Sequence, residues 1–180
     1  MSSPFSVLSL KNKSQDPLGF ANDLGLNFMQ WGFCGIKDHS IDKELVKEVV
    51  GIFSQFFSLS EDVKKQYYDS SLGGSRGYTP YKIETPKGGA SPDMKEFWHV
   101  GRELSPDHSY QKWMPDNYVV EEIPNFQEKT QELYDQFDKL GKTILTSIAL
   151  YLGLEETYFD GVVNEGNSIM RPIHYPAIES

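Results

Sequence analysis

The sequence lacks several features that would assign it to well-known classes of protein. It has a single cysteine, Cys34, which excludes an internal disulfide, and the flanking Phe33 and Gly35 suggest a small buried side chain rather than a nucleophile or a metal ligand. No apolar run approaches the ~20 residues of a membrane-spanning helix, and the N-terminus lacks the basic-then-apolar plan of a signal peptide. These absences predict a soluble protein of the cytoplasm.

Positive charge is also scarce. The chain has 17 Lys and Arg residues against 26 Asp and Glu residues, which gives a formal net charge of -9. Such a field repels phosphate backbones and anionic membranes, so neither nucleic acid nor a membrane is an expected partner. Apolar residues are abundant, at 38% hydrophobic and 13% aromatic, and 180 residues suit one domain or part of a larger one.

Apolar residues at three- and four-residue steps, together with capping residues, predict helices. The predicted helices begin at Asp16-Pro17, Ser40, Ser60 and Pro124, the last running to about Leu152 before Gly153, with one further turn over 155–159. The predicted strands cover residues 5–10, 33–37, 96–100 and 168–175. Irregular backbone is predicted over 69–92 and 105–124, where Gly, Ser, Pro and Asp accumulate. Segments of this kind often carry binding residues.

Three short segments stand out along this order of elements. They are Ser75-Arg76-Gly77-Tyr78-Thr79-Pro80, Asp93-Met94-Lys95-Glu96-Phe97 and Met170-Arg171-Pro172-Ile173-His174-Tyr175-Pro176. Together with the order of helices and strands from residue 5 to 176, they resemble the N-terminal region of the non-haem iron(II), 2-oxoglutarate-dependent oxygenases and their relative isopenicillin N synthase. The resemblance covers nearly the whole chain, and it depends on the series rather than on any single motif.

The resemblance implies an α+β fold. N-terminal helices, dominated by residues 124–152, would pack on the first strands of a jelly-roll (double-stranded β-helix) barrel, which agrees with the rule that a helical layer covers one face of a sheet. Residues 1–180 would form the N-terminal region of the oxygenase domain, with the barrel incomplete. The remaining half of the barrel, or a dimer partner, would then cover the apolar face.

The iron-binding motif of that family, His-x-Asp or His-x-Glu, is absent. His39, His99, His108 and His174 are followed two residues later by Ile, Gly, Tyr and Pro, and a site of two histidines and one carboxylate therefore has no candidate here. We expect no catalytic residue and no metal ligand within residues 1–180, and no specific binding of iron(II) or 2-oxoglutarate to them. The iron-binding half is expected beyond Ser180.

For the intact protein, the resemblance implies an oxidoreductase that uses Fe(II) and 2-oxoglutarate to hydroxylate, desaturate or cyclise a small molecule. Two other classes stay open. If 180 residues is the natural length, the chain is a non-catalytic binding or interaction protein. The third reading is an iron oxidase of the isopenicillin N synthase type that uses no 2-oxoglutarate.

Arg76 and Tyr78 are candidates for the substrate pocket. Gly77 permits a backbone conformation or a close approach that a side chain would block, while its neighbours offer a charged fork and a hydroxyl. In the resembling family this segment borders the substrate entrance. The alternative is that Tyr78 packs and Arg76 pairs with a nearby acid such as Glu84.

His99 is a third candidate. The two-residue period of a strand places it on the side of Phe97, with Trp98 and Val100 opposite, so it reaches a ligand if that side faces the barrel interior. The alternative is a histidine satisfied within the core or at the surface. The neighbouring charges of Asp93, Lys95 and Glu96 could orient the substrate loop, but the favoured interpretation is a surface ion-pair cluster that fixes strand register.

Tyr175 is the best single site candidate. The last predicted strand is similar to a family segment reading Leu-Arg-x-Asn-x-Tyr-Pro, in which the Asn and the Tyr help to position 2-oxoglutarate. Tyr175 matches the Tyr, but Ile173 stands where the Asn would be and offers no side-chain hydrogen bond. That mismatch favours, mildly, an enzyme that uses no 2-oxoglutarate. The alternative role for Tyr175 is packing beneath the barrel.

Overall fold

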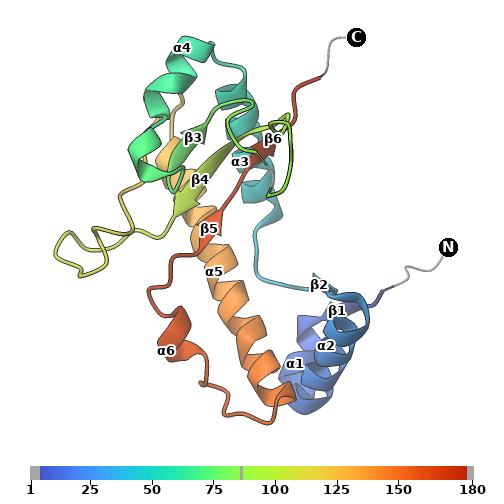
Figure 1. The fold of residues 1–180 in the computed structure, drawn as a ribbon. Coiled ribbons are helices and arrows are strands. Elements are labelled where there is room, and N and C mark those ends of the chain that lie inside the picture. The colour runs from blue at the N-terminus through green and yellow to red at the C-terminus, as the bar shows by residue number, and fades with distance from the viewer. Residues whose placement is uncertain (1–4, 86, 178–180) are drawn as a thin grey trace. The chain divides into compact units, whose positions relative to one another are not determined.

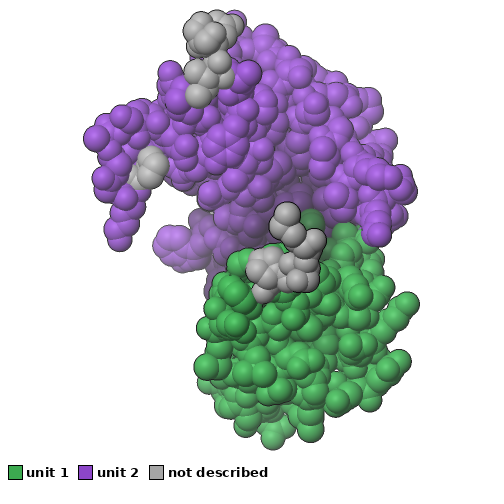
Figure 2. Space-filling model, turned by 90° about the vertical axis from the view of Figure 1, so that its right-hand side faces the viewer, with its two compact units in different colours: residues 1–41, 136–166 green, residues 42–135, 167–180 purple. Residues whose placement is uncertain are grey.

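The computed structural model describes residues 5–85 and 87–177. They form the α+β structure that the sequence predicts, and their strands belong to two separate sheets (Figure 1). The chain divides into two compact units, coloured separately in Figure 2. Unit 1 comprises residues 1–41 and 136–166, and unit 2 comprises residues 42–135 and 167–180. No helix of the described chain combines the length and the apolar character needed to cross a membrane.

Unit 1 is mostly helical. Its elements are β1 (Val7–Ser9), α1 (Leu10–Gln15), α2 (Pro17–Trp31), β2 (Gly35–Lys37), the end of α5 (Phe126–Tyr151) and α6 (Asp160–Val163). The strands β1 and β2 pair in parallel, with Val7 opposite Gly35. The predicted start of α2 is confirmed, because Asp16 accepts a hydrogen bond from the Gly19 amide at 2.9 Å and Pro17 is the first helical residue.

The strand predicted over 5–10 is shorter in the structure, where β1 ends at Ser9 and the chain continues as a helix. The polar residues after β1 form the helix α1, because the Ser9 hydroxyl caps it by accepting from the Lys11 amide at 3.2 Å. The further turn predicted over 155–159 is confirmed, because the Tyr158 amide donates to the Glu155 carbonyl at 2.9 Å, and the short helix α6 follows it at Asp160–Val163. Neither α1 nor α6 buries a residue, so the sequence shows no apolar stripe that would predict these helices.

Unit 2 holds the sheet that carries the three motifs. Its elements are α3 (Lys43–Phe57), α4 (Glu61–Lys64), η1 (Lys65–Tyr67), η2 (Ser70–Leu72), β3 (Gly77–Thr79), β4 (Glu96–Gly101), the start of α5, β5 (Ile169–Met170) and β6 (Ile173–His174). The strand β4 is central and antiparallel to all its partners, with β3 on one side and β5 and β6 on the other. The single strand predicted over 168–175 is thus two short strands, β5 and β6, which both pair with β4. Their pairing continues across the break, where Pro172 accepts from the Trp98 amide at 3.0 Å.

An aromatic core lies between the helices and β4. Trp98, only 1% exposed, meets the rings of Phe56 and Phe126 at centroid distances of 4.7 and 5.0 Å. The apolar stripe predicted for α3 is confirmed, since Phe53 and Phe56 are buried with the rest of it. The cap of α3 is Asp42 rather than Ser40, with the Glu44 amide donating to Asp42 Oδ1 at 2.8 Å.

The two faces of β4 have different roles. Trp98 lies in the aromatic core, while Phe97 and His99 share the opposite face with their rings 4.8 Å apart. The predicted alternation along this strand is therefore confirmed. It fixes which residues can meet the helices and which lie on the other side of the sheet.

Candidate functional site

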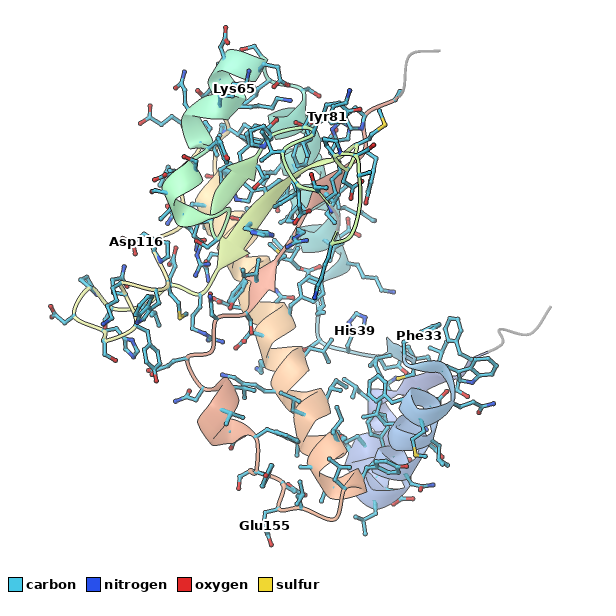
Figure 3. The ribbon with its side chains drawn as sticks, viewed as in Figure 1. Phe33, His39, Lys65, Tyr81, Asp116 and Glu155 are labelled. Atoms are coloured by element: carbon cyan, nitrogen blue, oxygen red, sulfur yellow. The ribbon has the colours of Figure 1, made fainter. Side chains whose placement is uncertain are left out.

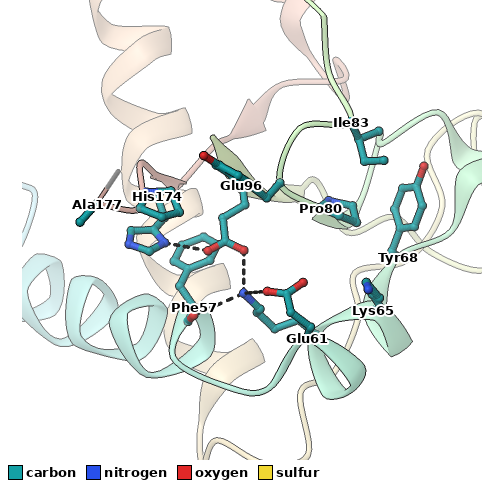
Figure 4. A pocket seen from close by; sticks show the side chains of 12 residues that line it. Phe57, Glu61, Lys65, Tyr68, Pro80, Ile83, Glu96, His174 and Ala177 are labelled. Carbon is teal, nitrogen blue, oxygen red and sulfur yellow. Dashed lines mark hydrogen bonds and ion pairs between the residues drawn. The ribbon is translucent and has the colours of Figure 1, made fainter. Parts of the chain in front are cut away.

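A buried carboxylate, Glu96, joins four elements of unit 2, and Figure 4 shows its contacts with Lys64 and His174. Its side chain on β4 is 2% exposed and accepts a hydrogen bond from the Tyr78 hydroxyl of β3 at 2.5 Å. The Lys64 ammonium of α4 lies 2.8 Å from Glu96 Oε2. On β6, His174 Nδ1 lies 2.7 Å from Glu96 Oε1. Three donors from three other elements thus converge on one carboxylate.

These donors decide the charge of the cluster. Burial alone raises the pKa of Glu96, but the hydrogen bonds from Lys64, Tyr78 and His174 outweigh burial and hold its pKa below the usual range. Burial lowers the pKa of Lys64, but the carboxylates of Glu61 and Glu96 raise it by more. The cluster therefore contains an ionised Glu96 beside a protonated Lys64. Burial and its bond to that carboxylate raise the pKa of the Tyr78 hydroxyl, which stays protonated as a donor.

A pocket of about 760 Å³ opens beside the cluster. Lys65 of η1 and Tyr81, which follows β3, line it from different elements and are labelled in Figure 3. The remaining lining residues are Phe57, Glu61, Lys64, Tyr68, Pro80, Ile83, Glu96, His174, Pro176 and Ala177. The ring of His174 stacks on Phe57 at a centroid distance of 5.2 Å, so the pocket has both an apolar wall and a charged one.

Arg76 lies elsewhere in unit 2 and is 1% exposed. Its Nη1 donates to the Ser75 carbonyl at 2.7 Å, and Nη1 and Nη2 reach Asn167 Oδ1 at 3.5 and 3.4 Å. The predicted alternative that Arg76 pairs with Glu84 is wrong, because Glu84 binds Lys95 at 2.7 Å. The guanidinium rests on Gly101, where a Cβ would lie 1.9 Å from Arg76 Cζ. Burial lowers the pKa of Arg76, and its Nε has no hydrogen-bond partner among the described residues.

Gly77 meets both conditions that its motif predicts. Its φ is +73°, and an added Cβ would lie 2.6 Å from the backbone oxygen of Tyr67. A side chain in the left-handed region costs about 1–2 kcal/mol, and overlap with a fixed carbonyl adds to that cost. We expect Gly77→Ala to lower the free energy of unfolding by about 2–3 kcal/mol in urea denaturation.

Gly73→Ala is the matched control for this substitution. Gly73 also has a positive φ, +57°, but nothing lies within 4 Å of a Cβ added there. Gly73→Ala should lower the free energy of unfolding by about 1 kcal/mol, which is the cost of the left-handed backbone alone. Equal losses in the two variants would show that the contact with Tyr67 is unimportant.

His99 is 5% exposed, and the protein uses both its ring nitrogens. Nδ1 bonds to the Gly74 carbonyl, which only accepts, and Arg171 Nε donates to Nε2 at 2.5 Å. These partners assign the proton to Nδ1 and the lone pair to Nε2. Burial lowers the pKa of His99, and the charges of Arg171 and Arg76 lower it further, so the ring is neutral at physiological pH.

Along the last segment, the side chains of Arg171, Ile173 and Tyr175 are exposed, and the residues between them are partly buried. Tyr175 is 63% exposed. Arg171 lies over the Phe97 ring, with Cζ 4.8 Å from the centroid. The exposed residues therefore follow the same sheet face as Phe97 and His99, and this surface is called the outer sheet face below.

The structure gathers the predicted site residues into two places. Tyr78 lies in the Glu96 cluster, with no exposed surface and its hydroxyl used within the protein. His99 and Tyr175 belong to the outer sheet face, and Arg76 is close enough to influence the charge of His99. Their contact with a substrate stays a prediction.

Sequence reasoning missed Glu96 as a site residue. The predicted surface ion-pair cluster is confirmed for Lys95, which binds Glu84 at 2.7 Å and Asp93 at 2.9 Å. It is wrong for Glu96, which faces inward. The signal was present, because Glu96 precedes Trp98 by two residues and so shares its buried face. Nothing in the sequence around Lys64 or His174 indicates that these residues would contact Glu96.

The described residues do not fit an iron site. Within residues 5–85 and 87–177, no three His, Cys, Asp or Glu side chains gather closely enough to hold a metal ion. His99 has both nitrogens engaged, and His174 uses Nδ1 on Glu96. We therefore assign these residues no step that passes through iron.

The sheet of unit 2 and the helices packed on it define a sheet-and-helix domain, and on the outer sheet face the exposed residues are Arg171, Ile173 and Tyr175. A family model described as the N-terminal region of a non-haem dioxygenase in morphine synthesis matches residues 4–122. A 2OG-Fe(II) oxygenase family protein from Caulobacter crescentus is 39% identical in sequence, and its crystal structure matches with a TM-score of 0.89 over 98% of this chain and 58% of that one.

Curated proteins agree with this match. A 2-oxoglutarate-Fe(II) type oxidoreductase from Emericella nidulans is 31% identical over 81% of this chain and 44% of its own length. A 2-oxoglutarate-dependent dioxygenase from Phoma sp. is 30% identical over 83% of this chain and 51% of its own length. The chain belongs to the non-haem iron(II), 2-oxoglutarate oxygenase family and corresponds to its N-terminal region. It spans about half the length of these curated relatives.

Proposed function

We propose that the intact protein is an iron(II)- and 2-oxoglutarate-dependent oxygenase that hydroxylates, desaturates or cyclises a small molecule in the cytoplasm. The observation that carries the proposal is the family match over residues 4–122, supported by 39% identity to the Caulobacter crescentus protein. Iron(II) with 2-oxoglutarate supplies the activation of oxygen in such an enzyme. Residues beyond Ser180 would supply the metal ligands and the rest of a jelly-roll barrel.

In this proposal, residues 1–180 bind and orient the substrate, and they take no part in the chemical step. The outer sheet face presents Arg171, Ile173 and Tyr175 to a small molecule, and the remaining barrel strands exclude water from it. The Glu96 cluster fixes β3, β4, β6 and α4 relative to one another, because one buried carboxylate joins all four. A rigid wall of this kind holds a substrate in one orientation, which is the protein's main contribution to cofactor chemistry.

Anaerobic titration calorimetry with iron(II) tests this division of labour. We expect one equivalent to bind the protein made from its complete reading frame, and no specific binding to residues 1–180. With oxygen and 2-oxoglutarate, the iron-loaded complete protein should form succinate. The physical reason is that the described residues bring together no ligand set for iron.

Two results would contradict the proposal. A natural stop codon directly after Ser180 would leave a non-catalytic binding protein. Stoichiometric iron binding by residues 1–180 would show that ligands were missed, and the loss of that binding in His99→Gln or His174→Gln would identify them.

A further inference from the structure

Two guanidinium groups lie near His99 without a carboxylate partner. Among the described residues, neither Arg76 nor Arg171 lies within ion-pair distance of an Asp or Glu, although acidic residues outnumber basic ones by 26 to 17. Both groups lower the pKa of His99 through their charge. The charge of Glu84, which pairs with Lys95, opposes them more weakly. The two positive charges therefore outweigh the carboxylate around His99, and a region of this kind attracts anions.

Arg171 is held in position from two sides. His99 accepts from its Nε at 2.5 Å, and the Phe97 ring lies beneath the guanidinium with Cζ 4.8 Å from the centroid. His99 is itself fixed by the Gly74 carbonyl. A protonated histidine could not accept this bond, so the neutral state of His99 is a condition of the arrangement.

The two terminal nitrogens of Arg171 remain available. Neither Nη1 nor Nη2 has a hydrogen-bond partner among the described residues, and the side chain is exposed on the outer sheet face beside Ile173 and Tyr175. A planar fork with two parallel donors matches the two oxygens of a carboxylate. Because Nε and the ring face are already used, the fork is oriented before a ligand arrives, which reduces the entropy lost on binding.

We propose that Arg171, positioned by neutral His99, binds a carboxylate group of the small-molecule substrate. The inference rests on the proposed function, which supplies the small molecule, and it adds the substrate class. Ile173 offers an apolar contact beside the fork, and Tyr175 offers an aromatic ring and a hydroxyl. The expected ligand is thus an organic acid with an apolar body. Arg76 is too buried to touch it and contributes only its charge.

Side-chain NMR of the complete protein tests the inference with benzoate as the probe and benzamide as its uncharged counterpart. Benzoate should shift the Arg171 Nε–H signal and saturate, whereas benzamide should leave it unchanged. We expect Arg171→Gln to weaken benzoate binding about tenfold or more, the loss typical of a hydrogen bond to a charged group. Arg171→Lys should bind with intermediate affinity because it keeps the charge but loses the fork.

Arg102→Gln is the matched control, since it removes the same charge just after β4, where Arg102 lies over the Tyr134 ring with Cζ 6.0 Å from its centroid. It should bind benzoate like the unaltered protein. His99→Leu removes the acceptor for Arg171 and should weaken binding, and His99→Gln, which keeps an acceptor oxygen, should restore part of it. If His99→Leu does not fold, Arg171→Gln still decides the matter, because its side chain is exposed.

The outcomes separate the inference from the proposed function. Succinate formation together with equal benzoate affinity in Arg171→Gln and Arg102→Gln would overturn the inference and leave the oxygenase intact. If benzoate binding depends on Arg171 but no succinate forms, the anion site is supported and the oxygenase function is contradicted. Inorganic phosphate that binds at Arg171 more tightly than benzoate would overturn the assignment to a carboxylate.

Discussion

Glu96→Ala is expected to lower the free energy of unfolding by about 3–5 kcal/mol, the cost of removing one partner from a buried ion pair. The substitution leaves the Lys64 ammonium, whose side chain is 5% exposed, with Glu61 as its remaining carboxylate. It also leaves the Tyr78 hydroxyl without its acceptor. Each buried group that loses its partner must still be kept out of water, so the penalty exceeds the value of any one bond. Urea denaturation at neutral pH measures it.

Glu84→Ala is the matched control, because it breaks another Glu–Lys pair of similar length. Glu84 binds Lys95 at 2.7 Å, but its side chain is 40% exposed, and water takes over the broken contact. The expected loss is below about 1 kcal/mol. If Glu96→Ala and Glu84→Ala lowered the free energy of unfolding by similar amounts, burial would add nothing to the stabilising effect of the Glu96 cluster.

Acid titration gives the Glu96 comparison a second readout. The folded-state pKa of Glu96 is held below its usual range, so the carboxylate stabilises the fold above the unfolded-state pKa and loses this contribution as the pH falls through the folded-state value. The stability difference between the unaltered protein and Glu96→Ala should therefore be constant near neutral pH and shrink below about pH 4. A difference that grows on acidification would contradict the assigned charge state.

Local features of the fold were predictable because their causes lie within a few residues. Asp16 and Pro17 start α2 through a cap and a fixed φ, and Gly153 follows α5 at a positive φ that other residues avoid. The alternation along β4 needed only a period of two, and it placed Phe97 and His99 on one face. These are short-range rules, and the structure agrees with them.

The candidate site was harder to predict because its partners are distant in sequence. Lys64 precedes Glu96 by 32 positions and His174 follows it by 78, and no short motif connects them. Charge also misled the interpretation, since Lys95 and Glu96 are neighbours yet one pairs at the surface and the other is buried. The alternation rule was the better guide for Glu96, because a residue two positions from Trp98 must share its face.

The second large effect is expected at Trp98, the centre of the aromatic core. Trp98→Ala removes a side chain that is 1% exposed and that contacts rings from α3, η1 and α5, including Phe56, Tyr67 and Phe126. Rings fixed on three separate elements cannot collapse into the space together, so a cavity remains. We expect a loss of about 3–5 kcal/mol, measured by urea denaturation followed by circular dichroism.

Trp113→Ala is the same substitution at a side chain that is 69% exposed, and it should change the stability by less than about 0.5 kcal/mol. Fluorescence separates the two residues before any denaturant is added. A tryptophan shielded from water emits at shorter wavelength, so Trp98→Ala should remove the blue edge of the emission spectrum. Trp113→Ala should only weaken the red edge, because Trp31, 43% exposed, also emits there. If Trp98→Ala kept both the blue edge and the stability, the aromatic core would not be what joins α3 and α5 to the sheet. The wall that presents Arg171 would then need another support.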